Sequence, residues 1–178
     1  ASCGYPYYVG GTFADRNQLL STPTGVVRDP KFYLNAKGIE ARTRTEATRI
    51  DPDAHTVTVK NLESGEEETL PYDKLILATG AKPIVPPVPG ADLEGITTLQ
   101  SMRDADYLRK VRDEGRIKNA VVVGAGLIGV ETCEALHLAG IQITVVEMLP
   151  QVLMFLDWEL AKLLENHMKA KGAHVITE

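Results

Sequence analysis

The most informative part of the sequence is the stretch Val121-Val122-Val123-Gly124-Ala125-Gly126-Leu127-Ile128-Gly129-Val130-Glu131. An apolar run leads into three glycines with the spacing GxGxxG. In this pattern Gly124 makes the tight turn after a strand, Gly126 lets the backbone approach a pyrophosphate, and Gly129 lets the next helix pack closely on the strand. That helix opens with Leu127 and Ile128 and offers free N–H groups to phosphates. The stretch therefore predicts a dinucleotide site.

Strands and helices alternate around this motif. The apolar pattern predicts strands over 119–123, 141–146 and 173–177 and helices over 101–114, 127–138 and 159–171. A βαβαβ alternation favours a parallel sheet with right-handed crossover helices. A lone GxGxxG is a weak signal, but this one follows an apolar strand and opens an apolar helix. We therefore predict an α/β fold of the Rossmann-like, dinucleotide-binding type.

The second strand of this unit ends in an acidic residue, Glu147. A carboxylate at this place accepts hydrogen bonds from the adenosine ribose hydroxyls. It would also repel a 2′-phosphate, and the following Met148-Leu149-Pro150 offers no arginine to bind one. Glu147 therefore favours NAD(H) over NADP(H) as the coenzyme.

The first half of the chain has β character. Asp29-Pro30 and Gly38 bound a short helix over 31–37. Strands are expected over 39–42, 46–50 and 56–59, with a hairpin turn at 63–66, a return strand to Leu70 and a strand buried on both faces over 75–78. These segments predict a small antiparallel β-meander. The prolines and the glycine of residues 83–90 then form a stiff linker, which is the clearest domain boundary, although such a stretch also suits a proline-binding partner.

Composition excludes several classes of protein. The chain has 178 residues, of which 44% are hydrophobic and 24% charged, and a net charge of -5, which is the profile of a soluble globular protein without a nucleic-acid-binding basic stripe. No apolar run approaches the roughly 20 residues that span a bilayer, and no secretory signal opens the chain. The two cysteines and four histidines show no metal-ligand spacing, so no metal site is expected. Cytoplasmic location is the default expectation.

Cys3 has two interpretations that the residues alone leave open. Most free cysteines are inert and buried. A reactive thiol needs a helix N-terminus or a neighbouring cation, and the helix that Cys3 could open is kept short by Pro6 and by Gly10-Gly11. Cys133, inside the helix after Gly129, is expected to be a buried structural residue.

Three segments, in this order, resemble the single-cysteine flavoprotein disulfide reductases. They are Ser2-Cys3-Gly4-Tyr5-Pro6-Tyr7-Tyr8-Val9-Gly10-Gly11, Leu77-Ala78-Thr79-Gly80-Ala81-Lys82-Pro83 and Leu127-Ile128-Gly129-Val130-Glu131. The group includes coenzyme A disulfide reductases, persulfide reductases, NADH oxidases and NADH peroxidases. The Cys-Gly-x-Pro-Tyr form is most similar to the coenzyme A disulfide and persulfide reductases.

The resemblance implies FAD and NAD(H) as cofactors and Cys3 as the redox residue, with a small disulfide or persulfide as substrate. It implies that Glu131 lies near the nicotinamide, although a first-turn helix glutamate is also common for its own sake. Ala78, Thr79 and Gly80 would contact FAD through their backbone, unless they only lead out of a strand. Ala47 would offer backbone groups to the adenine.

The same resemblance leaves other reactions open and implies a larger protein. An NADH oxidase or peroxidase would cycle Cys3 through a sulfenate, an electron-transfer reductase would use no cysteine, and the chain alone could be a non-catalytic nucleotide-binding piece. The group's first FAD-binding glycine motif, its later Gly-Asp segment and its C-terminal dimer domain are not found. We therefore expect a fold truncated at both ends, with residues 1–97 from the FAD-binding domain and residues 98–178 from the NAD(H)-binding domain of a homodimer.

Overall fold

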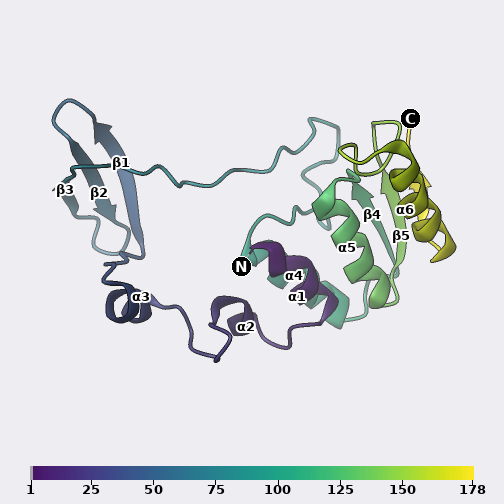
Figure 1. Ribbon diagram of the computed structural model, residues 1–178, viewed down its shortest axis with the longest axis horizontal. Coiled ribbons are helices and arrows are strands. Elements are labelled where there is room, and N and C mark those ends of the chain that lie inside the picture. Colours follow the sequence, from purple (N-terminus) through teal and green to yellow (C-terminus); the bar gives the residue numbers. More distant parts are fainter. Residues whose placement is uncertain (1) are drawn as a thin grey trace. The chain divides into compact units, whose positions relative to one another are not determined.

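The computed structural model describes residues 2–178, Ser2 by its backbone only. Its contacts divide the chain into two compact units (Figure 1). One unit joins the N-terminal residues up to Leu20 with residues 82–178, and the other comprises Ser21–Ala81. The predicted division after residue 97 concerns which cofactor each part binds, and it stays a prediction. The contacts themselves place the cysteine segment with the GxGxxG motif.

A three-stranded parallel sheet organises the first unit, in the order β4-β5-β6. Its strands are β4 (Asn119–Val123), β5 (Gln142–Val146) and β6 (His174–Ile176), and its crossover helices are α5 (Leu127–Leu138) and α6 (Trp158–Ala170). This confirms the predicted βαβαβ unit and its α/β fold class. The central strand β5 is the best buried, because Ile143 and Val145 have almost no exposed surface. Parallel strands need cover on both faces, which explains this apolar run.

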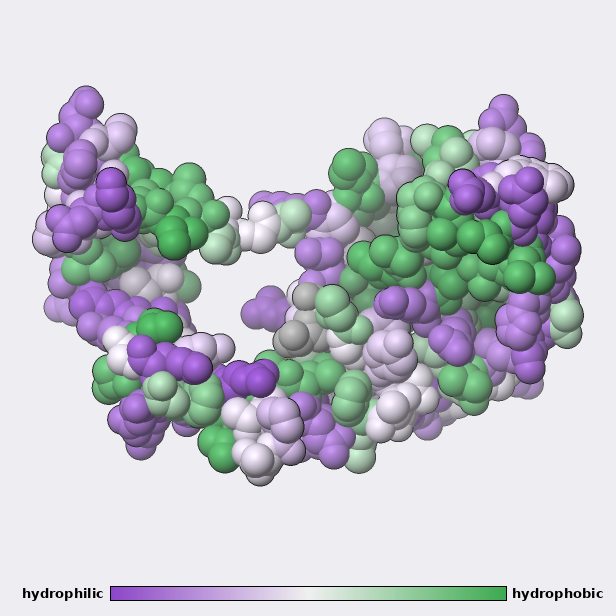
Figure 2. Space-filling model, in the orientation of Figure 1, coloured by the Kyte–Doolittle hydropathy of each residue, from purple (hydrophilic) through white to green (hydrophobic). Residues whose placement is uncertain are grey.

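Three N-terminal helical segments belong to the same unit: η1 (Ser2–Gly4), α1 (Tyr5–Gly10) and α2 (Arg16–Leu20). Helix α4 (Met102–Asp113) follows the proline-rich linker and confirms the helix predicted over residues 101–114. It begins with a capping box, in which Ser101 and Asp104 exchange hydrogen bonds between side chain and backbone. Helix α1 packs on both α4 and α5, and its Val9 is fully buried in the core. Figure 2 shows that apolar residues also gather on the surface of this unit.

The second unit is an antiparallel meander with one helix. Helix α3 (Pro30–Lys37) begins after the N-cap Asp29 and ends at Gly38, whose φ of 65° is left-handed, as expected for such a stop. Strands β1 (Thr45–Asp51), β2 (Thr56–Asn61) and β3 (Glu67–Pro71) pair in sequence order. The predicted β-meander is therefore confirmed.

Two predicted strands are wrong. Residues 39–42 and 75–78 form no strand. Leu75, Ile76 and Leu77 were expected to be buried on both faces, yet Ile76 is 86% exposed. A strand exists only where a neighbour completes its hydrogen-bond ladder, and the described residues supply none for this run. Helix α2 was not predicted, because its five residues are too few for a periodic pattern.

Candidate dinucleotide site and cysteine segment

The turn between β4 and α5 has the geometry that the GxGxxG motif predicts. Gly124 has a φ of 100°, a conformation that side-chain-bearing residues rarely adopt. A Cβ atom on Gly129 would overlap the carbonyl oxygen of Gly124 and lie 3.0 Å from its carbonyl carbon, so that only glycine allows this helix to sit on this turn. A Cβ on Gly126, in contrast, meets no described atom within 4 Å. The space over Gly126 is open on the side where a pyrophosphate would lie.

The beginning of α5 is suited to an anion. Gly126 is its N-cap and has no side chain to accept the first N–H groups of the helix. The side chains of Leu127 and Ile128 are more than half exposed and point away from the core. The first turn thus presents backbone N–H groups and the positive end of the helix dipole, which bind phosphate. The residues present therefore fit a dinucleotide pyrophosphate.

Glu147 is held against the glycine turn. Its Oε2 accepts a hydrogen bond from the backbone N–H of Ala125 at 2.6 Å, and its Oε1 accepts one from the N–H of Leu149 at 3.0 Å. Two N–H donors fix the carboxylate beside the motif, where the sequence predicts a ribose. The two hydrogen bonds hold the carboxylate in one orientation, which supports this role.

A second hydrogen bond to the same turn has no signal in the sequence. The carbonyl of Ala125 accepts a hydrogen bond from the backbone N–H of Leu153 at 2.9 Å. Leu153 is buried and has a φ of 46°, in the left-handed region that a leucine rarely occupies. Both backbone groups of Ala125 are therefore satisfied by the segment that follows β5. No residue-type pattern marks Leu153, since a left-handed leucine is set by its surroundings.

Helices α1 and α5 lie side by side and run in the same direction (Figure 1). Their contact is close, because a Cβ on Gly10 would lie 3.2 Å from the Cα of Ala135. A groove of about 270 Å³ follows the two helices, and it is lined by Pro6, Tyr7, Gly10, Thr12, Glu131, Glu134, Ala135 and Leu138. Because the helices are parallel, their beginnings lie at the same end. Cys3, just before α1, is thereby brought to the end of the unit that carries the glycine turn.

The two cysteines differ in exposure. Cys3 is exposed and Cys133 is buried. Burial raises the pKa of the Cys133 thiol to about 11, so this residue stays protonated near neutral pH and is unreactive. The prediction that Cys133 is a buried residue of α5 is confirmed. Glu131 lies half-buried on the groove, one turn into α5.

The remaining predicted site residues lie in the second unit. Ala47 is an exposed residue of β1, next to an irregularity in its pairing with β2. Ala78, Thr79 and Gly80 are exposed and lie outside any helix or strand, and Gly80 has a φ of 73°. The structure thus brings Cys3, Glu131, the glycine turn and Glu147 together in one unit, and it leaves the four residues expected at FAD in the other.

Residues 2–178 contain no candidate metal site and no candidate membrane-spanning helix. No group of three or more histidine, cysteine, aspartate or glutamate side chains is placed to hold a metal ion in this part of the chain. None of its helices combines the length and the apolar character needed to cross a bilayer.

Comparison with known proteins gives consistent matches along the whole chain. The family model described as pyridine nucleotide-disulphide oxidoreductase matches residues 4–178. An NADH oxidase of Methanocaldococcus jannaschii is 34% identical over 176 residues, which are 98% of this chain and 38% of that protein. The chain therefore spans well under half of this relative's length.

Solved structures give the same result. The NAD-dependent persulfide reductase from A. fulgidus matches with a TM-score of 0.92 and 42% identity over 99% of this chain and 32% of its own. The reduced CoADR-RHD of Bacillus anthracis matches with a TM-score of 0.90 and 36% identity over 100% of this chain and 31% of its own. The sequence resemblance and the fold are thus both confirmed, and the chain belongs to the pyridine nucleotide-disulphide oxidoreductase family.

Proposed function

We propose that the full-length protein is a flavin-dependent oxidoreductase that passes electrons from NADH to Cys3 and on to a small disulfide or persulfide. The observation that carries this proposal is the parallel packing of α1 on α5, which brings the exposed Cys3 to the same end as the glycine turn. A relative of similar fold is named a persulfide reductase, which supports the class of substrate.

The coenzyme side of the reaction depends on the turn between β4 and α5. Gly124, Gly126 and Gly129 keep this turn open to a pyrophosphate, and the N–H groups of Leu127 and Ile128 face it. The Glu147 carboxylate accepts hydrogen bonds from the ribose hydroxyls and disfavours a 2′-phosphate, so NADH is the proposed coenzyme. Glu131, half-buried one turn further along α5, orients the nicotinamide end.

Residues of the second unit contribute to FAD binding. The exposed backbone of Ala78, Thr79 and Gly80 is free of regular structure and open to a ligand, and Ala47 offers strand backbone to the adenine. When bound, FAD supplies two-electron transfer between a nicotinamide and a thiol.

The role of Cys3 follows from its chemistry. Its thiolate attacks one sulfur of the substrate disulfide, forms a mixed disulfide and releases the other half as a thiolate, which takes a proton from water. Two electrons and a proton then break the mixed disulfide, return Cys3 to the thiolate and release the second thiol. No other exposed thiol is present in residues 2–178, so Cys3 acts without a resolving cysteine of this chain.

An NADH oxidase or peroxidase with a cysteine-sulfenate cycle is the second candidate. The name of the Methanocaldococcus jannaschii relative and the exposure of a lone Cys3 favour it. Here the thiolate takes one oxygen from a peroxide and releases water, and two electrons and two protons return the sulfenic acid to the thiol with a second water. A sulfenate-trapping reagent added after peroxide treatment would label Cys3 in this cycle.

The test is an absorbance spectrum of the full-length protein, followed by anaerobic titration with NADH. We expect flavin bands that bleach with NADH, and substrate-dependent recovery that is lost in Cys3→Ser. A colourless protein that cannot be reconstituted with FAD would overturn the proposal. Full turnover in Cys3→Ser would overturn the role of the cysteine and favour an electron-transfer reductase.

A further inference from the structure

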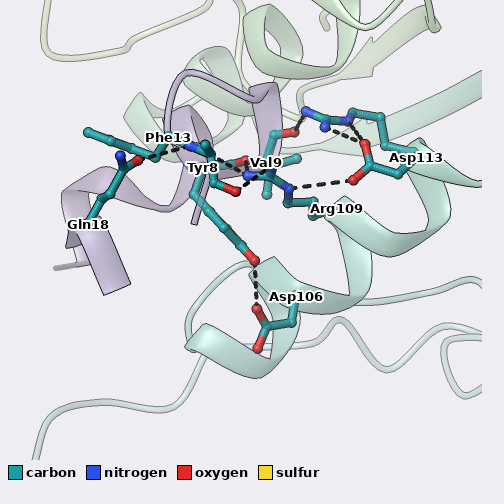
Figure 3. Close-up of polar contacts among 9 residues, drawn as sticks. Tyr8, Val9, Phe13, Gln18, Asp106, Arg109 and Asp113 are labelled. Carbon is teal, nitrogen blue, oxygen red and sulfur yellow. Dashed lines mark hydrogen bonds and ion pairs between the residues drawn. The ribbon is translucent and has the colours of Figure 1, made fainter. Parts of the chain in front are cut away.

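The carbonyl groups at the end of α1 are held by an arginine of α4. The guanidinium of Arg109 donates hydrogen bonds to the carbonyls of Tyr8 at 3.1 Å and Ala14 at 3.2 Å, and also to that of Phe13 (Figure 3). Its Cζ lies 4.5 Å from the centre of the Tyr8 ring, in a cation–π arrangement. Only 18% of the Arg109 side chain is exposed. One side chain thus joins α1 to the loop that follows it.

A second arginine and two aspartates of α4 complete this clamp. Arg112, whose side chain is 13% exposed, donates to the carbonyl of Val9, and Asp113 pairs with both arginines. One turn before Arg109, Asp106 accepts the hydroxyl of Tyr8 at 3.0 Å and pairs with Arg16 of α2 at 2.9 Å. Burial of the ring, together with the Asp106 carboxylate, raises the pKa of the Tyr8 hydroxyl and keeps it a donor. Successive turns of α4 therefore hold α1 and α2 together.

The charge and shape of the arginines explain why they suit this place. Helix α1 has six residues, so its last carbonyls have few partners within the helix. Positive charge is favourable at a helix C-terminus. A guanidinium offers five N–H donors in a planar fork, which a lysine cannot reproduce. The clamp therefore fixes both the position and the orientation of α1.

The clamped helices α1 and α2 adjoin the segment that carries Cys3. Cys3 and Gly4 lead directly into α1, and a Cβ on Gly4 would overlap the side chain of Leu19 in α2. Arg109 holds the loop between α1 and α2, and Asp106 holds both helices. The position of Cys3 thus depends on α4, which stands next in the chain to the strand that opens the glycine turn.

We infer that Arg109 is a positioning residue for Cys3, which fixes the thiol relative to the dinucleotide end of the unit. This inference rests on the proposed function, because it assigns Arg109 to the thiol half of that reaction. Loss of the clamp should slow the steps that involve Cys3 and spare the reduction of the bound flavin by NADH. A purely structural contribution would lower both in parallel.

The test compares Arg109→Met, Arg109→Lys and Arg103→Met in the full-length protein. Arg103 is exposed on the same helix and provides the matched control. The first readout uses the protein without FAD: hydrogen exchange of residues 5–14 and the rate at which iodoacetamide alkylates Cys3. The second uses the protein with FAD: the rate of flavin reduction by NADH and the disulfide-dependent turnover.

We expect Arg109→Met to raise the exchange of residues 5–14, to change the alkylation rate and to lower turnover by about tenfold or more, with flavin reduction unchanged. Arg109→Lys should give an intermediate result, and it carries the test if Arg109→Met does not fold. The inference would be overturned if both Arg109 variants behaved like Arg103→Met. It would also be overturned if flavin reduction and disulfide-dependent turnover fell in parallel. If NADH did not reduce the wild-type protein, the proposed function would be overturned. Hydrogen exchange of residues 5–14 and alkylation of Cys3 would still test whether Arg109 positions Cys3.

Discussion

The two units of the chain are stabilised by different interactions. Every buried apolar side chain found in residues 3–178 belongs to the unit with the parallel sheet, and none belongs to residues 21–81. The meander is ordered by its ladders and by side-chain pairs at its surface, such as Arg42 with Glu68. A parallel sheet is stable only when both faces are covered, whereas antiparallel strands can stay exposed on one face. Buried side chains in this chain are therefore concentrated in the unit that holds the glycine turn and Cys3.

The largest effect should come from deleting a core side chain. Ile143 is 1% exposed at the centre of the parallel sheet, and Ile50 is 41% exposed in the meander. We expect Ile143→Ala to lower the free energy of unfolding by about 4 kcal/mol, because it leaves a cavity. Ile50→Ala should cost less than about 1 kcal/mol. Denaturant unfolding of both variants measures this, and equal losses would show that the two units do not differ in how much their apolar side chains stabilise them.

The next prediction compares two glycines of the glycine turn. Gly129→Ala places a methyl group against the backbone of Gly124, so we expect a loss of about 2 kcal/mol in stability together with weaker NADH binding. Gly126→Ala meets open space, so its stability should stay within about 0.5 kcal/mol of the wild type while NADH affinity falls about tenfold. Thermal unfolding and calorimetric titration test the pair. If Gly126→Ala binds NADH as tightly as the wild type, the pyrophosphate does not lie over that glycine.

Only part of this structure could be predicted from the sequence. Local rules predicted the glycine turn, the position of Glu147 and the stop of α3 at Gly38, since each depends on a few neighbouring residues. The strand at 75–78 was wrong because a strand requires a partner that the pattern of one segment does not supply. Leu153 and the Arg109 clamp were missed because both join segments distant in sequence. The packing of α1 on α5 escaped prediction for the same reason, although Gly10 is its contact point.

A smaller effect concerns the coenzyme and leaves the core untouched. Met148 is 84% exposed beside Glu147, so an arginine there would have room to meet a phosphate. We expect the double variant Glu147→Ala with Met148→Arg to shift the ratio of NADPH to NADH affinity by about tenfold or more, since it removes a repulsion and adds a charged donor. Met148→Arg alone is the control and should give a smaller shift, because Glu147 still repels a 2′-phosphate. An unchanged ratio in the double variant would mean that Glu147 does not face the ribose.

The smallest effect contrasts one carboxylate from each unit. Glu165 of α6 is 3% exposed and is the one buried carboxylate found in residues 3–178, while Glu68 is exposed on the meander. Hydrogen bonds from Lys162 and Lys169, each at 2.7 Å, hold the pKa of Glu165 below its usual range.

A depressed pKa in the folded state stabilises the protein above the unfolded value of about 4.3, and this contribution is lost as the pH falls further through the folded value. We therefore expect Glu165→Gln to cost about 0.5 kcal/mol at pH 7 and to flatten the loss of stability below about pH 4.3. Glu68→Gln should leave the curve unchanged, because an exposed pair contributes little. Unfolding curves of the wild type and both variants from pH 3 to pH 7 measure this pH dependence. An acid-induced loss equal in wild type and Glu165→Gln would show that the two lysines do not stabilise the ionised carboxylate, and that the buried unit has no greater dependence on pH than the exposed one.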